Sequence, residues 1–307
     1  MKKVKVYAPG SIGNVGCGFD VFGLALNVAG DILEVEENNI GALRIIDIIG
    51  DDSITRKAEK NIVTVAAQAL LNEVGSKQGF DFTLTKGVLA GSGLGSSGCS
   101  ATAGVFAINE LLGQPYSKME LLKFASVGEQ IASHQVHYDN IAPSMFGGFT
   151  ITRSNNPLEI LQLAVPDNLY LAIVRPNVII KTNEAKQMLG NTMPLANAIT
   201  QFGNIAGLIM GMQNNDIPLI GRSVEDLVAT PIRSKLIPKF DEAKEAALSA
   251  GATGFNIAGS GPAMFAICQG KAMAENVTKA LKQVYIADHA ANYYITQADV
   301  KGTRIID

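Results

Sequence analysis

Apolar and polar residues alternate in short runs over the first half of the chain, and longer stretches with helical periodicity separate these runs. Residues 80–86 alternate most clearly: Phe80, Phe82 and Leu84 are apolar and the residues between them are polar, as in a half-buried strand. Together with runs rich in Val, Ile and Leu, the pattern predicts strands over residues 4–8, 31–36, 43–48 and 80–86. Helices are predicted over residues 62–74, 99–112 and 117–134.

The pattern restarts at residue 169 in the second half of the chain. Strands are predicted over residues 169–174, 253–258, 263–267 and 293–295, and helices over residues 183–190, 194–213, 216–227, 237–250 and 272–284. An Asn155-Asn156-Pro157 turn lies between the two halves. Because 307 residues leave room for two domains, we expect one domain over residues 1–160 and another over residues 161–307.

Composition narrows the class of protein. With 47% hydrophobic and 17% charged residues, the chain can bury a sizeable core and does not have the composition of a disordered protein. The net charge of −3 and the absence of a Lys/Arg cluster give no indication of nucleic-acid or membrane binding. The three cysteines are odd in number and lack CxxC spacing, which fits a reducing compartment. No run of residues is apolar enough for a signal sequence or a membrane span. We therefore expect a cytoplasmic globular enzyme or binding protein.

The strongest chemical signal is a glycine- and serine-rich stretch between the strand at 80–86 and the following helix. It consists of Gly91, Ser92, Gly93, Leu94, Gly95, Ser96, Ser97 and Gly98. The N-terminus of a helix presents unpaired N–H groups and a partial positive charge, which attract phosphate. Glycine lets the backbone approach an anion closely, and the serine hydroxyls can bind phosphate or Mg²⁺. This stretch predicts a loop that binds phosphate, and residues 91–98 are called the phosphate loop below.

Residues 93–98 also match GxGxxG, so a dinucleotide-binding motif has to be considered. That motif requires a strand after the helix and an acidic residue about 20 positions further on. Here a second helix follows the first, and no acidic strand end lies at that distance. The sequence also lacks the Gly-Lys-Ser/Thr of a Walker A loop. A different nucleotide site is favoured, with a glycine-rich turn that binds nothing as the alternative.

Glu129 lies on the apolar face of the helix predicted over 117–134. It is four residues after Ala125 and eight after Leu121, so its carboxylate projects from the same face. A carboxylate directed at a core needs a cation or hydrogen-bond donors. Two roles are open on this observation: a structural salt bridge, or a Mg²⁺ ligand together with the hydroxyl of Ser97.

Three separated stretches resemble the signatures of the GHMP kinases, which include galactose, homoserine, mevalonate and phosphomevalonate kinases. Residues 8–14 (APGSIGN) resemble the first signature, residues 93–97 (GLGSS) the second, and residues 258–262 (AGSGP) the third. The resemblance implies a two-domain α+β fold, with an ATP-binding N-terminal domain like ribosomal protein S5 domain 2, a ferredoxin-like C-terminal domain, and the active site between them. It also implies ATP and Mg²⁺ as cofactors and a possible homodimer.

Within the family, residues 14–20, 139–143 and 146–148 are similar to the members that act on L-homoserine. That resemblance implies substrate-binding roles for Asn14, Asp20, His137, Asp139, Asn140, Thr182, Lys186 and Arg233. It implies ATP contacts from Asn61, Lys86, the phosphate loop, Gly259, Ser260 and Gly261. Asn14, Glu129 and Asn140 are the expected catalytic residues, and Ser97 and Glu129 the expected metal ligands. Lys186 stands where those members carry an arginine, and lysine keeps the charge without the bidentate fork.

The reaction implied by the resemblance is transfer of the γ-phosphoryl group of ATP to the hydroxyl of L-homoserine, a step of threonine biosynthesis. Phosphoryl transfer depends mainly on positioning and charge stabilisation. Asn14 and Asn140 would orient the hydroxyl, and Asp139 would contact the substrate or act as a base. Two alternatives are kept: another GHMP kinase with a mevalonate-type acceptor, and a family member that binds ligands without catalysis.

Overall fold

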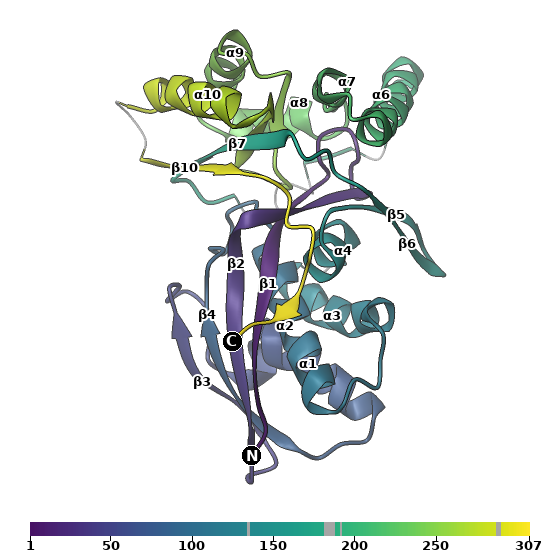
Figure 1. The fold of residues 1–307 in the computed structure, drawn as a ribbon, viewed down its shortest axis with the longest axis vertical. Helices are drawn as coiled ribbons and strands as arrows, with labels where there is room; N and C mark the ends of the chain where they lie inside the picture. Colours follow the sequence, from purple (N-terminus) through teal and green to yellow (C-terminus); the bar gives the residue numbers. More distant parts are fainter. Residues whose placement is uncertain (134–135, 181–187, 191, 287–289) are drawn as a thin grey trace.

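The computed structural model describes residues 1–133, 136–180, 188–190, 192–286 and 290–307. The chain forms two layered units, one above the other in Figure 1, each with a sheet covered by helices. None of the helices in the described ranges is both long and apolar enough to cross a membrane.

The first sheet belongs to the N-terminal half. Its strands are β1 (Lys3–Gly13), β2 (Phe22–Asn38), β3 (Leu43–Ile49), β4 (Gly79–Thr85), β5 (Phe149–Asn155), β6 (Leu158–Leu163) and β11 (Arg304–Ile305). The order is β11-β1-β2-β4-β3, and the β5–β6 hairpin pairs with the other end of β2. All pairs are antiparallel except β3 with β4. The alternation seen in the sequence is preserved, since Phe80, Phe82 and Leu84 are buried.

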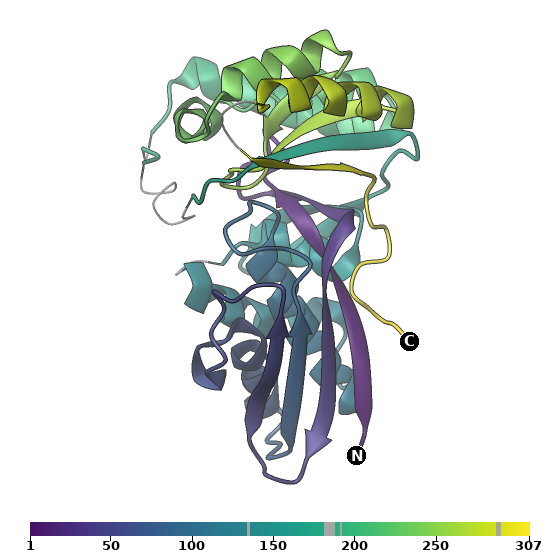
Figure 2. The same ribbon diagram turned by 90° about the vertical axis from the view of Figure 1, so that its left-hand side faces the viewer.

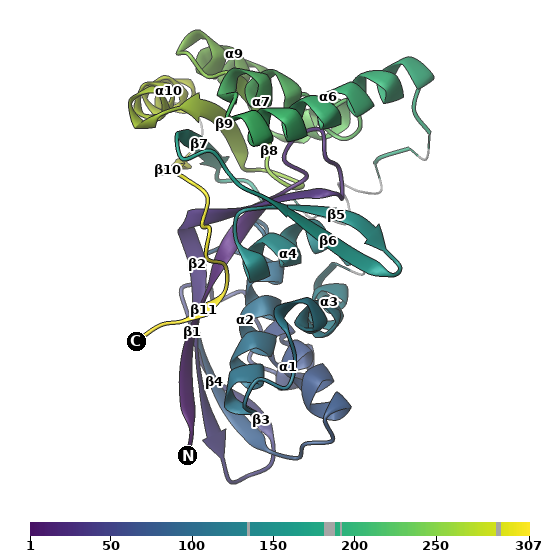
Figure 3. The ribbon, with the colours of Figure 1, turned by 45° about the vertical axis from the view of Figure 1, so that its right-hand side comes forward.

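Four helices cover one face of this sheet, as Figure 3 shows: α1 (Ile62–Glu73), α2 (Ser96–Leu111), α3 (Lys118–Ser133) and α4 (Tyr138–Phe146). Helix α2 packs on β1 and β2 and is itself covered by α1 and α3. Because nearly all of its residues from Gly98 on are buried, α2 is a central helix, as its small and apolar residues require. Its N-terminus points out of the core toward the C-terminal half.

The second sheet, in the C-terminal half, has the order β10-β7-β9-β8 and is antiparallel throughout. Its strands are β7 (Leu169–Pro176), β8 (Gly254–Ile257), β9 (Met264–Gln269) and β10 (Ala291–Thr296). When these four strands are numbered 1 to 4 along the chain, their order in the sheet is 4-1-3-2. With helices in the crossover connections, this is the ferredoxin-like arrangement that the resemblance implied. Its helices within the described ranges are α6 (Leu195–Asn214), α7 (Ile217–Ser223), α8 (Thr230–Arg233), α9 (Phe240–Ser249) and α10 (Lys271–Val284). Short 3₁₀ turns lie at Ala58–Lys60 in the N-terminal half and at Ser234–Leu236 in the C-terminal half.

The end of the chain returns to the first sheet, as Figure 2 shows. After β10 the chain descends, and β11 pairs with β1 through Val6 with Ile305 and Tyr7 with Arg304. The Asn155-Asn156-Pro157 turn joins the strands of the β5–β6 hairpin. The two halves are therefore connected twice, by the segment after β6 and by the C-terminal segment.

Most predicted elements are confirmed, and their limits differ in instructive places. Helix α2 begins at Ser96 rather than residue 99, α7 ends at Ser223 rather than residue 227, and β2 begins nine residues before the predicted strand at 31. The sequence did not predict α4, α8, β5, β6 or β11. The helix expected over 183–190 falls largely outside the described residues, and residues 188–190 are not helical.

Candidate active site

Three glycine-rich stretches, residues 8–14, 87–95 and 258–263, meet between the two sheets. Backbone hydrogen bonds join them: Ser11 N–H donates to Leu94 O (3.0 Å), Gly259 N–H to Gly13 O (3.1 Å) and Ala263 N–H to Ser92 O (3.2 Å). Gly93 shows why glycine is needed, because its φ is +82° and a Cβ there would lie 2.8 Å from the carbonyl oxygens of Ala258 and Gly261. The third stretch therefore packs beside the phosphate loop.

The phosphate loop leads directly into the N-terminus of α2. Gly95 is the N-cap residue with φ 69°, and as a glycine it has no side chain with which to cap the helix. A Cβ on Gly95 would lie 2.1 Å from the hydroxyl oxygen of Ser11, so the close approach of β1 also requires glycine. The first turn of α2 thus leaves its N–H groups and its partial positive charge available to an anion.

A cavity of about 640 Å³ opens above this helix end, within the size range of small-molecule sites. Most of the residues predicted to form the site line it: Asn14, Asp20, Asn61, Lys86, Gly91, Ser92, Gly93, Gly95, Ser96, Ser97, Glu129, His137, Asp139, Asn140, Arg233, Gly259 and Ser260. They come from both halves of the chain. The cavity is therefore a site between the two units.

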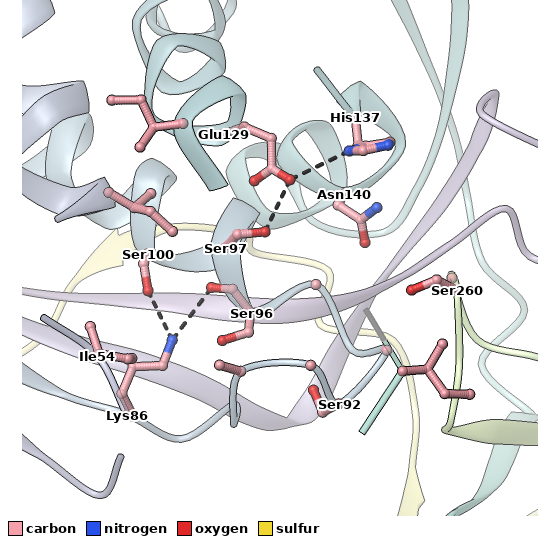
Figure 4. A pocket seen from close by; sticks show the side chains of 18 of the residues that line it. Ile54, Lys86, Ser92, Ser96, Ser97, Ser100, Glu129, His137, Asn140 and Ser260 are labelled. Atoms are coloured by element: carbon pink, nitrogen blue, oxygen red, sulfur yellow. Dashed lines mark hydrogen bonds and ion pairs between the residues drawn. The ribbon is translucent and has the colours of Figure 1, made fainter. Parts of the chain in front are cut away.

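Glu129 is inside the molecule, as the helical pattern predicted: it is 3% exposed, and Leu121 and Ala125 on the same face are fully buried. The hydroxyl of Ser97 donates a hydrogen bond of 3.0 Å to Oε1 of Glu129 (Figure 4). His137 is a second neighbour, with 3.5 Å between its Nδ1 and the same oxygen. The carboxylate therefore stands at the helix N-terminus next to a hydroxyl and an imidazole, compatible with either role considered for it.

The protonation of His137 depends on its acidic neighbours. Burial by itself lowers the pKa of this imidazole, but the hydrogen bond with Glu129 and the charges of Asp139 and Asp20 outweigh burial and raise its pKa. A protonated His137 can donate to Glu129 through Nδ1. It would also lessen the repulsion among the carboxylates around it.

Helix α4, which the sequence did not predict, places Asp139 and Asn140 beside the first glycine-rich stretch. Oδ2 of Asp139 accepts the backbone N–H of Asn14 (3.1 Å), and Oδ1 of Asn140 accepts the hydroxyl of Ser11 (3.1 Å). Asn14 has φ 67°, and its amide donates to Gly259 O at 2.9 Å while its Oδ1 accepts the N–H of Asp20 at 2.9 Å. Asn14 therefore ties the first and third glycine-rich stretches together.

Asp139 is almost completely buried, and burial together with the negative charge of Asp20 raises its pKa from 3.8 to about 6. The raised value means that the free protein is stabilised by neutral Asp139 below about pH 4 and loses this stabilisation as the pH rises through 6.

We therefore predict that Asp139→Asn raises the melting temperature of the ligand-free protein at about pH 8 by several degrees and much less at about pH 5. Asparagine keeps an oxygen for the N–H of Asn14 and carries no charge to desolvate. Thermal unfolding of both proteins across this pH range checks the prediction. A difference in melting temperature that does not vary with pH would contradict the assigned titration.

Arg233 enters the cavity from α8, in the C-terminal half. Its side chain is 3% exposed, its Nη1 donates to Gly259 O (3.1 Å), and its guanidinium lies 5.4 Å from the centre of the Phe19 ring. Burial lowers the pKa of this guanidinium, and the charges of Asp20, Asp226 and Asp139 oppose that effect. Nε of Arg233 has no acceptor in the described part of the chain. This buried donor is thus available to an anionic group in the cavity.

The other predicted site residues lie at the edge of the cavity, in the loops around it, or outside the described ranges. The Asn61 side chain caps α1 through the N–H of Val63 (3.0 Å), and Lys86 lies at the base of the phosphate loop. Leu94 and Gly261 help to hold the loops together, and Gly98, in α2, packs against Asn140 of α4. None of the three is among the residues that line the cavity. Thr182 and Lys186 lie outside the described residues.

Several lining residues were not predicted from the sequence: Ser53, Ile54, Thr55, Lys60, Ile62, Leu84, Ala90, Ser100, Ile131, Ile179 and Ile180. Ser100 could have been found, because it lies one helical turn after Ser96. The isoleucines could not, since an apolar wall of a cavity has the same sequence pattern as a core.

Comparison with known proteins shows the family to which this chain belongs. Residues 61–148 match the model of the GHMP kinases N terminal domain and residues 208–287 that of the GHMP kinases C terminal. A homoserine kinase of Chloroherpeton thalassium is 39% identical, with 100% of each chain covered. A homoserine kinase of Methanococcus maripaludis is 38% identical over 87% of this chain and 88% of its own.

Comparison with solved structures points to the same family. A homoserine kinase from Cytophaga hutchinsonii superposes with a TM-score of 0.96 at 41% identity, covering 100% of this chain and 98% of the other. An L. major mevalonate kinase, solved with R-mevalonate, superposes with a TM-score of 0.73 at 16% identity and 97% coverage of both chains, which shows a common fold.

Proposed function

The chain belongs to the GHMP kinase family, and from this premise we propose that it transfers the γ-phosphoryl group of ATP to the hydroxyl of L-homoserine, giving O-phospho-L-homoserine for threonine biosynthesis. The observation that carries the proposal is a single cavity with a phosphate loop on one side and buried acidic and basic side chains on the other.

The phosphate side is supported by the chain's own dipoles. The N-terminus of α2 and the glycine-rich backbone around it would hold the phosphates of ATP, as at other helix N-termini that bind anions. Ser92 adds a hydroxyl donor, whereas the hydroxyls of Ser96 and Ser97 already donate to Val88 O and to Glu129. Because these groups are fixed before ATP binds, they need little reorganisation during the reaction.

The donor set at this helix end fits Mg²⁺. Ser97 and Glu129 present hard oxygen atoms 3.0 Å apart, and Mg²⁺ at nucleotide sites usually takes one or two protein ligands plus phosphates and water. No group of three His, Cys, Asp or Glu side chains in the described ranges could hold a metal by itself, which favours a metal shared with the nucleotide. Bound Mg²⁺ would neutralise phosphate charge as the phosphoryl group transfers.

The acceptor side offers a counter-charge for each end of an amino acid. Arg233 provides a buried cation for the carboxylate, and Asp139 and Asp20 provide negative charge for the ammonium group. We also assign Lys186 to the carboxylate end and Thr182 to a contact with the substrate. His137 would hydrogen-bond the substrate from α4's N-terminal side.

Asn140 and Asn14 would orient the acceptor hydroxyl. Both line the cavity next to the phosphate loop, and Asn140 carries an amide that can donate to or accept from a hydroxyl. Phosphoryl transfer with a loose transition state needs the hydroxyl in line more than it needs a strong base. We therefore assign Asp139 to the substrate's ammonium group rather than to a base.

The three buried free cysteines support a cytoplasmic location.

An ADP-release assay with MgATP and four acceptors tests the function: L-homoserine, L-threonine, mevalonate and galactose. We expect turnover on L-homoserine alone. Turnover on another of these alcohols and none on L-homoserine would retain the kinase and reject the substrate. ATP binding without turnover on any of them would instead favour a family member that binds ligands without catalysis.

A further inference from the structure

Asp31 is a fully buried carboxylate that does not line the cavity. It lies in β2 beneath the phosphate loop and is 0% exposed. A carboxylate out of contact with water is costly unless donors and a cation surround it. The identity of those donors indicates what Asp31 does.

One oxygen of Asp31 holds the beginning of the segment 87–100, which contains the phosphate loop. Oδ1 accepts the backbone N–H groups of Gly87 (3.1 Å) and Val88 (3.3 Å), where the chain leaves β4. Gly87 has to approach closely, since a Cβ there would lie 2.0 Å from Gly30 O. The exit of the chain from β4 is therefore fixed to β2 by this carboxylate.

The other oxygen holds the end of the same segment. Oδ2 accepts the hydroxyl of Ser100 in α2 (2.6 Å) and forms an ion pair with Lys86. Nζ of Lys86 donates in turn to Ser100 Oγ (2.8 Å) and Ser96 O (3.4 Å), as Figure 4 shows. Ser96 Oγ closes the base of the loop by donating to Val88 O (2.7 Å).

We propose that Asp31 is a positioning residue for ATP, which fixes the chain on both sides of the phosphate loop, at Gly87–Val88 and at Ser100, and holds the ammonium group of Lys86 at the floor of the cavity. The inference rests on the proposed function. Lys86 lies near the positive end of α2, where an unpaired cation would be repelled. Asp31 compensates that charge, so the ammonium group stays beneath the loop and the loop keeps its phosphate-binding shape.

Asp31→Asn is the first test. The asparagine oxygen can still accept the N–H groups of Gly87 and Val88, but the ion pair with Lys86 is lost. We expect MgATP affinity, measured by calorimetry, to fall by about tenfold or more, the usual effect of losing a partner that orients a binding group. The KM for ATP should rise in parallel, and the KM for L-homoserine should stay within about twofold.

A double replacement tests whether the two charges act as one unit. Lys86→Met alone leaves the Asp31 carboxylate buried without its cation, whereas Asp31→Asn with Lys86→Met buries no charge. We expect the double variant to bind MgATP no worse than the weaker single variant and to melt at a higher temperature than either. If the loss of MgATP binding free energy in the double variant equals the sum of the losses in the two single variants, the inference is wrong.

Asp299→Asn is a matched control outside the cavity. Asp299 is also buried, accepts the N–H groups of Lys301 and Gly302 (2.9 Å each), and pairs with Arg304 at 2.9 Å. Its replacement should lower the melting temperature and leave MgATP affinity unchanged. If Asp31→Asn does the same, Asp31 is only structural and the inference is wrong.

The test also covers a single variant that does not fold and a wild-type protein that is inactive on L-homoserine. Should Asp31→Asn fail to fold, the double variant is compared with Lys86→Met alone, and a further loss of MgATP affinity in the double variant, or wild-type affinity in both, would overturn the inference. Calorimetry with MgATP alone does not depend on the acceptor. A wild-type protein without activity on L-homoserine would therefore reject the proposed function and leave the role of Asp31 to be judged by its own result.

Discussion

The Glu129→Gln enzyme is expected to keep its fold and to lose kcat by on the order of a hundredfold or more. Glutamine retains the shape of the side chain and an oxygen that can accept the hydroxyl of Ser97. It removes the negative charge that, in our proposal, binds Mg²⁺ at the N-terminus of α2. Steady-state kinetics at increasing Mg²⁺ concentration measure the effect, and partial recovery at high Mg²⁺ is expected if the metal is bound more weakly.

Glu120→Gln serves as the control on the same helix. Glu120 is in the first turn of α3, exposed to solvent, and accepts the N–H and hydroxyl of Ser117 at 2.8 and 2.7 Å. Its replacement should leave kcat unchanged. Wild-type kcat in Glu129→Gln at every Mg²⁺ concentration would exclude the metal-ligand role. The contact with His137 would then be a structural ion pair, the other role that the sequence left open.

The central elements of the fold could be predicted because their signals are local. The alternation of Phe80, Phe82 and Leu84 predicted β4, and the glycine-rich stretch after it predicted a loop before a helix. Both depend on residues close together in the sequence. The order of the strands could not be predicted this way, because pairing between β11 and β1 joins the two ends of the chain.

Helix α4 was missed for a definite physical reason. Pro143 lies inside it and has no N–H to donate to the carbonyl of Asp139, so local rules predict an interruption there. Tertiary packing outweighs that rule. A Cβ on Gly23 would lie 2.1 Å from Asp139 O, so β2 packs directly against the helix at this point. Resemblance identified the residues of α4, but their helical arrangement required the structure.

The residues of the candidate site also fall into those that a local sequence signal predicts and those that it does not. The position of Glu129 followed from helical periodicity, since a charged residue on an apolar face is visible in the sequence. Asp31 gave no such signal. Its partner Lys86 is 55 residues away, and the contact depends on the register of β2 with β4, where Ile32 pairs with Thr85. Arg233 was predicted from resemblance alone, because a single arginine in a short helix is usually a surface residue.

Arg233→Met is expected to raise the KM for L-homoserine by more than about thirtyfold, as when one member of a buried charge pair is removed. The guanidinium is buried between Phe19 and Gly259, and its Nε has no acceptor in the described ranges, so the substrate carboxylate can pair with it. The KM for ATP should change by less than about threefold, because Arg233 is not part of the phosphate loop. Steady-state kinetics with each substrate varied in turn measure both values.

Aminopropanol, which is homoserine without its carboxyl group, makes the test specific. If Arg233 binds the carboxylate, the wild type and Arg233→Met should use aminopropanol equally poorly, and only L-homoserine should distinguish them. Arg175→Met is the matched control, since Arg175 is also buried with an Nε that lacks an acceptor in the described ranges, and it does not line the cavity. That control should lower stability without raising the KM for L-homoserine. An equal loss on both alcohols in Arg233→Met would mean that Arg233 supports the shape of the site and does not bind the carboxylate.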